Sequence, residues 1–341
     1  MVTRKEVARR ARVSVGTVSN VINHKDIVQP KTVERVRQAI RELNYVPDQI
    51  AKSLAQRRTN HIGVAIYEMT NPYHAEVVRG LESYAAKKGY IVSTFFLNNN
   101  AEKKMDEICE RRLAGLVNFM TNDLPHSFIN ILKSHKVVLA NFNEDESFIF
   151  QHDYSAAMKT YFEALKQLGK RNIAYISTAD RLRFLADTRG VAYYRYVSEF
   201  GMAEDDALVV FNDRYDMPSQ TIGYLGCQRL LESGARPDAI FVTNDIAAMG
   251  VLRRLCDNGI RCPEDVAVIG CDDIALGKVF IPAISTITVN SVAYGEAIAE
   301  TMIARIENPE ANPYKKVVLE AQPCFRESLC ADALPLSFKC K

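Results

Sequence analysis

Polar side chains able to bind a small molecule stand directly after the apolar runs of this 341-residue sequence. Their carboxylate, amide, phenol and guanidinium groups form directional hydrogen bonds with hydroxyls. The pattern predicts a site for a small polar ligand such as a sugar. The residues are Tyr73, His74, Asn141, Asp153, the segment Arg181 to Arg189, Asn244, Asp245, Asp272 and Asp273.

The elements that must position these side chains are apolar runs of strand length separated by amphipathic stretches of helix length. Examples are "HIGVAIY", "NIAYIS", "AIFVT" and "VAVIG". Unbroken apolar strands between helices indicate parallel sheets covered on both faces. The sequence contains enough of these runs to form two sheets, which predicts two doubly wound α/β units. In such sheets ligands bind beyond the carboxyl ends of the strands, which is where the polar residues lie.

Motifs that would indicate an enzyme are absent from the sequence. There is no phosphate-binding Gly-x-x-x-x-Gly-Lys-Ser/Thr loop, no Gly-x-Gly-x-x-Gly and no Gly-x-Ser-x-Gly elbow. The 8 cysteines include no Cys-x-x-Cys pair, which argues against a zinc site. We therefore expect no catalytic residue, no metal ion and no cofactor.

The charge of the chain is unevenly distributed. Residues 1–60 carry 13 Lys and Arg against 5 Asp and Glu, a net charge of +8, whereas the remainder has a net charge of −6. A small basic module attached to a mildly acidic body predicts a polyanion partner for the first 60 residues only.

Two short helices are predicted in the basic module. Thr3 and Glu6 fit a capping box that starts a helix running to about Ala11. Ser14 fits the N-cap of a second helix. The apolar face of that helix consists of Val18, Val21 and Ile22. Two helices joined by so short a turn form a helix-turn-helix.

The outward face of the second helix carries small and polar residues. Small side chains let a helix enter the DNA major groove, and hydroxyls and amides can meet base edges or phosphates. This face is predicted to contact DNA. Its residues are Val15, Gly16, Thr17, Ser19 and Asn20.

A third helix is expected from Pro30, and its apolar stripe closes a three-helix core; the stripe consists of Val33, Val36, Ile40 and Leu43. After Pro47, residues 48–57 favour a further short helix. One interpretation is a linker helix packed on the body. The other is a hinge that folds on DNA and inserts Leu54 between base steps from the minor groove.

Several segments together resemble one family. The segments "VTRKEVARRARVSVGTVSNVIN", "VRQAIRELNYVPDQIAKSLA", "IGVAI" and "NPYHAEVVRGLESYAAKKGY" follow each other in register, down to "FRESL" near the C-terminus. This order resembles the lactose/galactose-repressor (LacI/GalR) family of bacterial transcription regulators. The resemblance implies a sequence-specific DNA-binding regulator, which we expect to be a repressor controlled by a small-molecule effector.

The resemblance assigns DNA contacts to individual residues. Base reading falls to Val15, Gly16 and Asn20, and DNA backbone contacts to Thr3, Ser14, Thr17 and Ser19. The hinge and minor-groove contacts fall to Ala51, Lys52 and Leu54. Gly16 departs from the larger polar residues of many members. Specificity is therefore expected to rest on Val15 against a thymine methyl and on Asn20.

The resemblance also selects effector-binding residues. Arg189 and Asp272 match the ligand-binding arginine and aspartate of the family, Asn244 a pocket position and Tyr73 an aromatic wall. Positions used in only some members are Asn141 and Arg183. His74 replaces the stacking Phe of members that bind flat bases, which weakens a purine interpretation. A sugar or sugar phosphate is the first expectation, and a nucleoside or nucleobase is the alternative.

The domain organisation implied by the resemblance is discontinuous. We expect a helix-turn-helix domain at residues 1–46, a hinge helix at 47–59, an effector-binding and dimerisation domain at 60–330 and a tail at 331–341. The large domain divides into two Rossmann-like subdomains of periplasmic-binding-protein type. These are residues 60–157 with 290–317, and residues 158–289 with 318–330.

The expected partners are double-stranded operator DNA with a pseudo-palindromic sequence, the effector and a second copy of the chain. A solute-binding protein without a DNA role is the other class considered, because the body alone resembles periplasmic sugar-binding proteins. The start "MVTRKEVARR" lacks a signal-peptide core, and no apolar run reaches membrane-span length. We therefore expect no membrane contact and a cytoplasmic protein, nucleoid-associated when bound to DNA.

Overall fold

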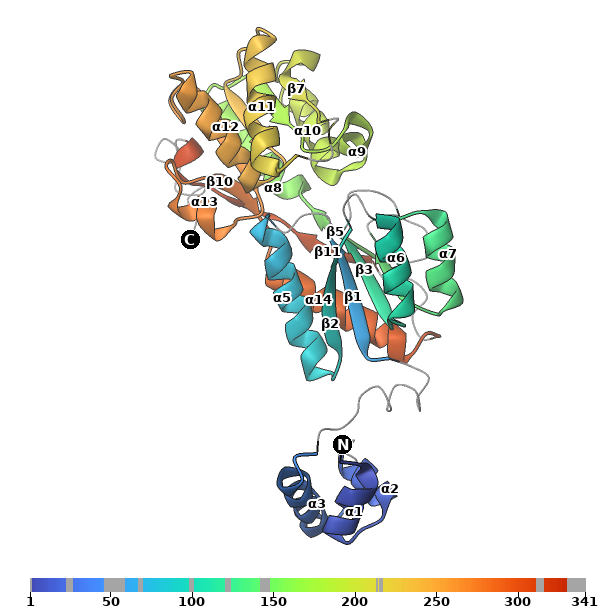
Figure 1. The fold of residues 1–341 in the computed structure, drawn as a ribbon. Helices are drawn as coiled ribbons and strands as arrows, with labels where there is room; N and C mark the ends of the chain where they lie inside the picture. Colours follow the sequence, from blue (N-terminus) through green and yellow to red (C-terminus); the bar gives the residue numbers. More distant parts are fainter. Residues whose placement is uncertain are drawn as a thin grey trace. The chain divides into compact units, whose positions relative to one another are not determined.

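The computed structural model describes residues 2–22, 27–45, 59–66, 70–97, 101–119, 124–141, 148–212, 214, 217–310 and 316–329. The chain divides into an N-terminal unit, residues 1–59, and a large unit, residues 60–341 (Figure 1). Among the described helices, none combines the length and the hydropathy that a membrane span requires.

The N-terminal unit is a three-helix bundle, as predicted. Its helices are α1 (Arg4–Ala11), α2 (Val15–Ile22) and α3 (Pro30–Glu42). Val7, Val18 and Val36, one from each helix, are fully buried in a common apolar core. The 3/4 spacing of apolar residues places one face of each helix against the other two.

Local capping chemistry fixes the ends of these helices. The Glu6 carboxylate accepts hydrogen bonds from the backbone N–H of Thr3 at 2.6 Å and from its hydroxyl at 2.8 Å, which forms the predicted capping box. Ser14 Oγ accepts the backbone N–H of Thr17 at 3.0 Å. The turn between α1 and α2 is made by Arg12 at a positive φ of 52°.

The large unit contains two lobes, each built on one six-stranded sheet. The first sheet has the order β11-β5-β4-β3-β1-β2, and its pairings are parallel. Its strands are β1 (His61–Ile66), β2 (Ile91–Phe96), β3 (Gly115–Phe119), β4 (Val138–Asn141), β5 (Phe148–Asp153) and β11 (Lys316–Glu320). One face packs against α5 (Pro72–Lys87) and α14 (Ser291–Glu307), the other against α6 (Ala101–Glu110) and α7 (His126–Ser134). This is the first lobe.

The second lobe has a sheet of order β12-β10-β9-β8-β6-β7. Its strands are β6 (Ile173–Ile176), β7 (Val209–Val210), β8 (Ala239–Val242), β9 (Ala267–Cys271), β10 (Ser285–Thr288) and β12 (Gln322–Cys324). Helices α8 (Ser155–Gln167) and α10 (Thr188–Glu199) cover one face, and α11 (Ser219–Glu232) and α12 (Asp245–Asp257) cover the other. Short helices α9 (Arg181–Ala186) and α13 (Ala275–Val279) follow β6 and β9. β12 is antiparallel to β10, whereas parallel sheets were expected.

The chain crosses between the lobes three times. The crossings lie between β5 and α8, between β10 and α14, and at Ala321 between β11 and β12. The predicted boundaries after residues 157 and 317 therefore fall inside α8 and β11, four or fewer residues from the crossings. Neither element shows a break in its hydrophobic pattern, so the sequence carries no local signal for these two positions.

Glycines set the close approach of α5 and α14. A Cβ at Gly80 would lie 2.0 Å from the Val292 carbonyl oxygen, and one at Gly295 would lie 2.0 Å from the Val77 carbonyl oxygen. Only residues without a side chain permit this backbone contact. The two helices therefore form one rigid layer of the first lobe, although more than 200 positions separate them.

Candidate functional site

The outward face of α2 is accessible in the N-terminal unit. Val15 is 43% exposed, Gly16 is exposed, and Asn20 and Ser19 are half-buried. The Ser14 and Thr17 hydroxyls lie 2.9 Å apart, and the Thr3 hydroxyl is bonded to Glu6. The candidate backbone-contact hydroxyls of Thr3, Ser14 and Thr17 thus already fix α1 and α2, while Val15 and Asn20 project from a helix held in place beneath them.

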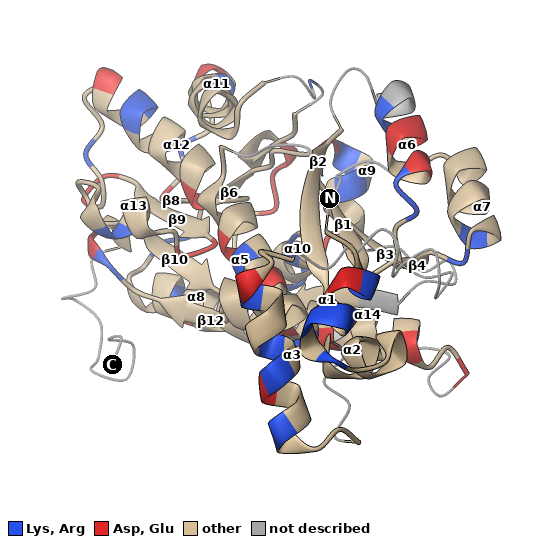
Figure 2. Cartoon of the chain, turned by 60° about the horizontal axis from the view of Figure 1, so that its bottom comes forward, with Lys and Arg blue, Asp and Glu red and all other residues tan. Residues whose placement is uncertain are grey.

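The N-terminal unit carries an excess of positive charge. Figure 2 shows Lys and Arg on α1 and α3 of the N-terminal unit, with few acidic residues among them. Two of these arginines are paired with acidic side chains, Arg10 with Glu42 and Arg41 with Glu34. Exposed pairs of this kind contribute little to stability. The remaining excess of basic residues leaves the unit suited to a polyanion.

The predicted hinge residues Ala51, Lys52 and Leu54 lie outside the described residues. The candidate tail at 331–341 also lies outside them. Their assigned roles stay predictions.

In the large unit, polar side chains from both lobes meet at the carboxyl ends of the strands. We call this group the interlobe cluster; it consists of Asn71, Tyr73, His152, Thr188, Asp187, Arg189 and Asp272. Asn71 Nδ2 of the first lobe donates to Asp272 Oδ2 of the second at 2.9 Å. The Thr188 hydroxyl donates to the backbone carbonyl of His152 at 3.1 Å. These two hydrogen bonds join the lobes directly.

Asp272 is held in an unusual conformation at the end of β9. Its φ is 105°, in a region that side chains other than glycine rarely occupy, and Asp273 follows with a φ of 55°. Asp272 is only 8% exposed. Burial raises the pKa of its carboxyl to about 6, although the Asn71 hydrogen bond and the Arg189 charge act in the opposite direction. A strained, buried carboxylate at a junction between lobes is typical of a binding site.

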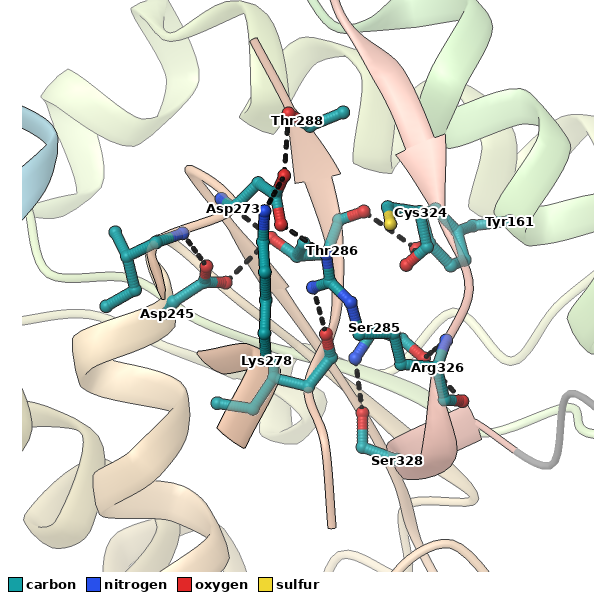
Figure 3. A network of polar contacts seen from close by, with 12 residues as sticks. Tyr161, Asp245, Asp273, Lys278, Ser285, Thr286, Thr288, Cys324, Arg326 and Ser328 are labelled. Carbon is teal, nitrogen blue, oxygen red and sulfur yellow. Dashed lines mark hydrogen bonds and ion pairs between the residues drawn. The ribbon is translucent and has the colours of Figure 1, made fainter. Parts of the chain in front are cut away.

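A polar network holds the turn that carries Asp272 (Figure 3). The buried Asp245 carboxylate accepts the backbone N–H of Ile274 at 3.0 Å and the Thr286 hydroxyl at 2.7 Å. Asp273 forms an ion pair with Arg326 and lies 3.3 Å from Lys278 Nζ. Asp245 and Asp273 therefore hold the turn that carries Asp272.

Arg189 is fixed by a neighbouring carboxylate. Its Nε donates to Asp187 Oδ1 at 2.9 Å, its Nη2 to Asp187 Oδ2 at 2.6 Å, and its Nη1 to the Thr243 carbonyl at 2.8 Å. The guanidinium lies over the Tyr154 ring, 5.2 Å from its centroid. Burial opposes its charge, but Asp187 holds the pKa of Arg189 well above its usual value. Arg189 therefore stays protonated and is ion-paired with Asp187.

His152 brings an unsatisfied polar atom to the cluster. Its Nε2 lies 2.8 Å from the Tyr73 hydroxyl, and its ring packs on Tyr294 with centroids 4.0 Å apart. His152 Nδ1 and the Tyr294 hydroxyl are buried and have no hydrogen-bond partner within the described ranges. Burial, followed by the charge of Arg189, lowers the pKa of His152 to about 3. The imidazole is therefore neutral at physiological pH.

The other predicted effector residues lie on several elements of the two lobes. Asn244 is buried, and its Oδ1 accepts the Ala247 N–H at 2.8 Å as the N-cap of α12. His74 is half-buried, with its ring 6.2 Å from that of Phe119. Arg183 lies on α9, 3.6 Å from Asp180. Asn141 is the last residue of β4, and its side chain lies outside the described part of the chain.

Asn71, His152 and Asp187 were not among the predicted site residues. Asn71 precedes Pro72 and caps α5, a signal that indicates a helix start and no more. His152 is the next-to-last residue of β5, so its position at a strand end could have indicated it. Asp187 lies two residues before Arg189, and only the folded geometry shows their pairing.

Two parts of the sequence match known protein families. Residues 3–48 match the family described as "Bacterial regulatory proteins, lacI family", and residues 162–329 match "Periplasmic binding protein-like domain". The ribose operon repressor of Haemophilus influenzae is 31% identical over 334 residues, covering 96% of this chain and 99% of the relative. The chain belongs to the lacI family of bacterial regulatory proteins.

Two further relatives of this lacI-family chain agree. The transcriptional repressor PurR of Vibrio atlanticus is 31% identical over 334 residues, covering 95% of this chain and 96% of the relative. The lac repressor dimer bound to operator and an anti-inducer superposes with a TM-score of 0.78 at 22% identity, covering 96% and 98% of the two chains. The lacI-family chain is thus a DNA-binding transcription regulator under effector control, and its family is one of regulators and not of enzymes.

Proposed function

We propose that the protein is a transcription repressor that binds a pseudo-palindromic operator as a homodimer, and that a sugar or sugar phosphate at the interlobe cluster controls its affinity for DNA. The observation that carries this proposal is the Asn71 to Asp272 hydrogen bond, which joins the two lobes through a buried carboxylate. A regulator of this kind acts by binding operator DNA, so we propose that the protein is located in the cytoplasm and, when bound to DNA, on the nucleoid.

The DNA-binding half of the proposal rests on α2. Val15 and Asn20 present a methyl surface and an amide from the exposed side of a capped, packed helix. A methyl group can contact thymine, and an amide can bond adenine bidentately. One such helix makes few base contacts, so two copies on two half-sites are needed for specificity. We assign Leu54 to the minor groove between the half-sites.

The effector half rests on competition for Asp272. A ligand hydroxyl that donates to this carboxylate would replace or share the Asn71 hydrogen bond and so change the relative stability of two lobe arrangements. A ligand shifts such an equilibrium only by its differential affinity for the two states. The unsatisfied His152 Nδ1 and Tyr294 hydroxyl offer further positions for ligand hydroxyls. The similarity to the ribose operon repressor of Haemophilus influenzae supports a sugar effector.

The test is thermal unfolding of the full chain with a panel of sugars, sugar phosphates, nucleosides and nucleobases, followed by operator binding with each hit. A ligand at 100 times its Kd adds about 2.7 kcal/mol of stability. We expect a sugar or its phosphate to stabilise the protein and to change operator affinity. Stabilisation by a nucleobase alone would contradict the sugar class. Absence of any salt-dependent binding to duplex DNA would contradict the repressor role.

A further inference from the structure

We infer that Asp187 is a permanent counter-ion of Arg189 and that the interlobe cluster therefore selects an uncharged, hydroxyl-bearing effector over its phosphate ester. The inference rests on the proposed function for the location of the effector. A free sugar is thereby favoured over a sugar phosphate, both of which the proposed function admits.

Asp187 is held in place independently of any ligand. Its Oδ1 accepts the backbone N–H of Arg189 at 2.8 Å, which makes Asp187 the N-cap of α10. Both of its carboxylate oxygens also accept hydrogen bonds from the Arg189 guanidinium. Burial alone would raise the pKa of the Asp187 carboxyl, but Arg189 holds it below its usual value, so it stays ionised. An anionic ligand cannot displace this carboxylate without also uncapping the helix.

The ion pair with Asp187 leaves the Arg189 guanidinium with N–H donors for a ligand, but the pair as a whole has no net charge. Arg189 has five N–H groups. Three of them donate to Asp187 and Thr243, and the other two have no partner among the described residues. Both side chains keep access to solvent, with 20% of Arg189 and 31% of Asp187 exposed. These two N–H groups, one on Nη1 and one on Nη2, can donate to hydroxyl oxygens of a polyol as well as to oxygens of an anion.

The surrounding groups carry no compensating positive charge. Arg183, the other arginine predicted to contact the effector, lies next to Asp180. His152 is neutral, and Asp272 becomes negative above pH about 6. The cluster therefore has a net charge of zero or below at physiological pH, and a phosphate dianion would meet Asp187 and Asp272 without an excess of cations. Repulsion between the phosphate and these two carboxylates disfavours phosphate binding.

Removal of the Asp187 charge gives a direct test. Asp187→Asn keeps the N-cap, since Asn and Asp cap helices equally well, and it keeps one acceptor for Arg189. We would measure thermal unfolding of the full chain in inorganic phosphate against sodium chloride of equal ionic strength. The wild type should show no specific phosphate stabilisation. The variant should bind phosphate at least roughly tenfold more tightly, because one charge-assisted hydrogen bond becomes available.

Two further variants locate the effect and guard against misfolding. Asp205→Asn removes a carboxylate that caps a different helix, the 3-10 helix Asp206–Leu208, and should behave as wild type. Asp187→Ser is the alternative variant if Asp187→Asn folds poorly. It also keeps a capping side chain, and it should likewise gain phosphate binding. Adding Arg189→Ala to Asp187→Asn should abolish the gain, which separates this site from phosphate bound by the basic N-terminal unit.

The outcomes separate this inference from the proposed function. Equal phosphate binding by wild type and Asp187→Asn, or preference of the wild type for a sugar phosphate over the free sugar, would overturn the counter-ion role. If no sugar stabilises the wild type but Asp187→Asn still gains phosphate binding, the sugar effector fails while the counter-ion role stands.

Discussion

Replacing Asp272 by asparagine should make the effector-free protein more stable at neutral pH. Asp272 is buried, and its pKa of about 6 lies above the value of an aspartate in the unfolded chain. The folded state therefore binds more protons than the unfolded state between pH about 4 and about 6, so the free energy of unfolding falls as pH rises through this window.

The magnitude follows from the two pKa values. A shift of about two units corresponds to about 3 kcal/mol of stability lost once the carboxyl is ionised. Asp272→Asn cannot ionise, retains an oxygen that accepts from Asn71 Nδ2, and tolerates a positive φ well. The variant should match the wild type near pH 4 and exceed it by up to about 3 kcal/mol at pH 8. It should also lose stabilisation by the effector.

The assay is urea unfolding followed by far-UV circular dichroism, since the chain contains no tryptophan. Asp265→Asn is a control of opposite sign, because hydrogen bonds from Arg261 lower the pKa of Asp265 to about 2. That variant should be less stable than wild type at pH 8, with the difference disappearing at low pH. A stability difference for Asp272→Asn that does not change with pH, or a loss of stability at pH 8, would refute the reasoning.

Other substitutions test the DNA-binding unit and the first lobe. Asn20→Ala should relax base preference at one position per half-site, costing about 1–3 kcal/mol in competition assays over operator variants; a uniform loss across sequences would mean a phosphate contact. Leu54→Ala should weaken operator binding while sedimentation shows an intact dimer, and unchanged affinity would remove the minor-groove role. Gly295→Ala places a Cβ 2.0 Å from the Val77 carbonyl oxygen and should lower stability by about 1–3 kcal/mol in thermal unfolding. An unaltered Tm would contradict the close helix contact.

Elements specified by local chemistry could be predicted from the sequence. The capping box at Thr3 and the N-cap at Ser14 act within three or four residues, so the helix starts of the N-terminal unit follow from short patterns. The apolar runs "HIGVAIY", "NIAYIS", "AIFVT" and "VAVIG" form the strands β1, β6, β8 and β9, which are buried apart from His61. The segment "ALVVF", residues 207–211, is as apolar as these runs, but a 3-10 helix occupies Asp206–Leu208 and only Val209–Val210 form a strand.

Features that depend on distant partners could not be predicted. β12 has three residues, one of them Pro323, and it exists as a strand only because β10 offers an antiparallel edge. Asn71 meets Asp272 across 201 positions of sequence. Nothing near either residue specifies that pairing. The charge of Arg189 was visible in the sequence, but its neutralisation by Asp187 depends on the turn between α9 and α10.

The three crossings also determine the order in which the chain can mature during synthesis. The first lobe needs α14 and β11, and the second needs β12, so both sheets stay incomplete until the ribosome has released residues beyond 320. Such long-range pairing is slow to form. The three-helix unit has its own core and is made first. The nascent chain therefore has a folded DNA-binding unit before the large unit, which is proposed to bind the effector, is complete.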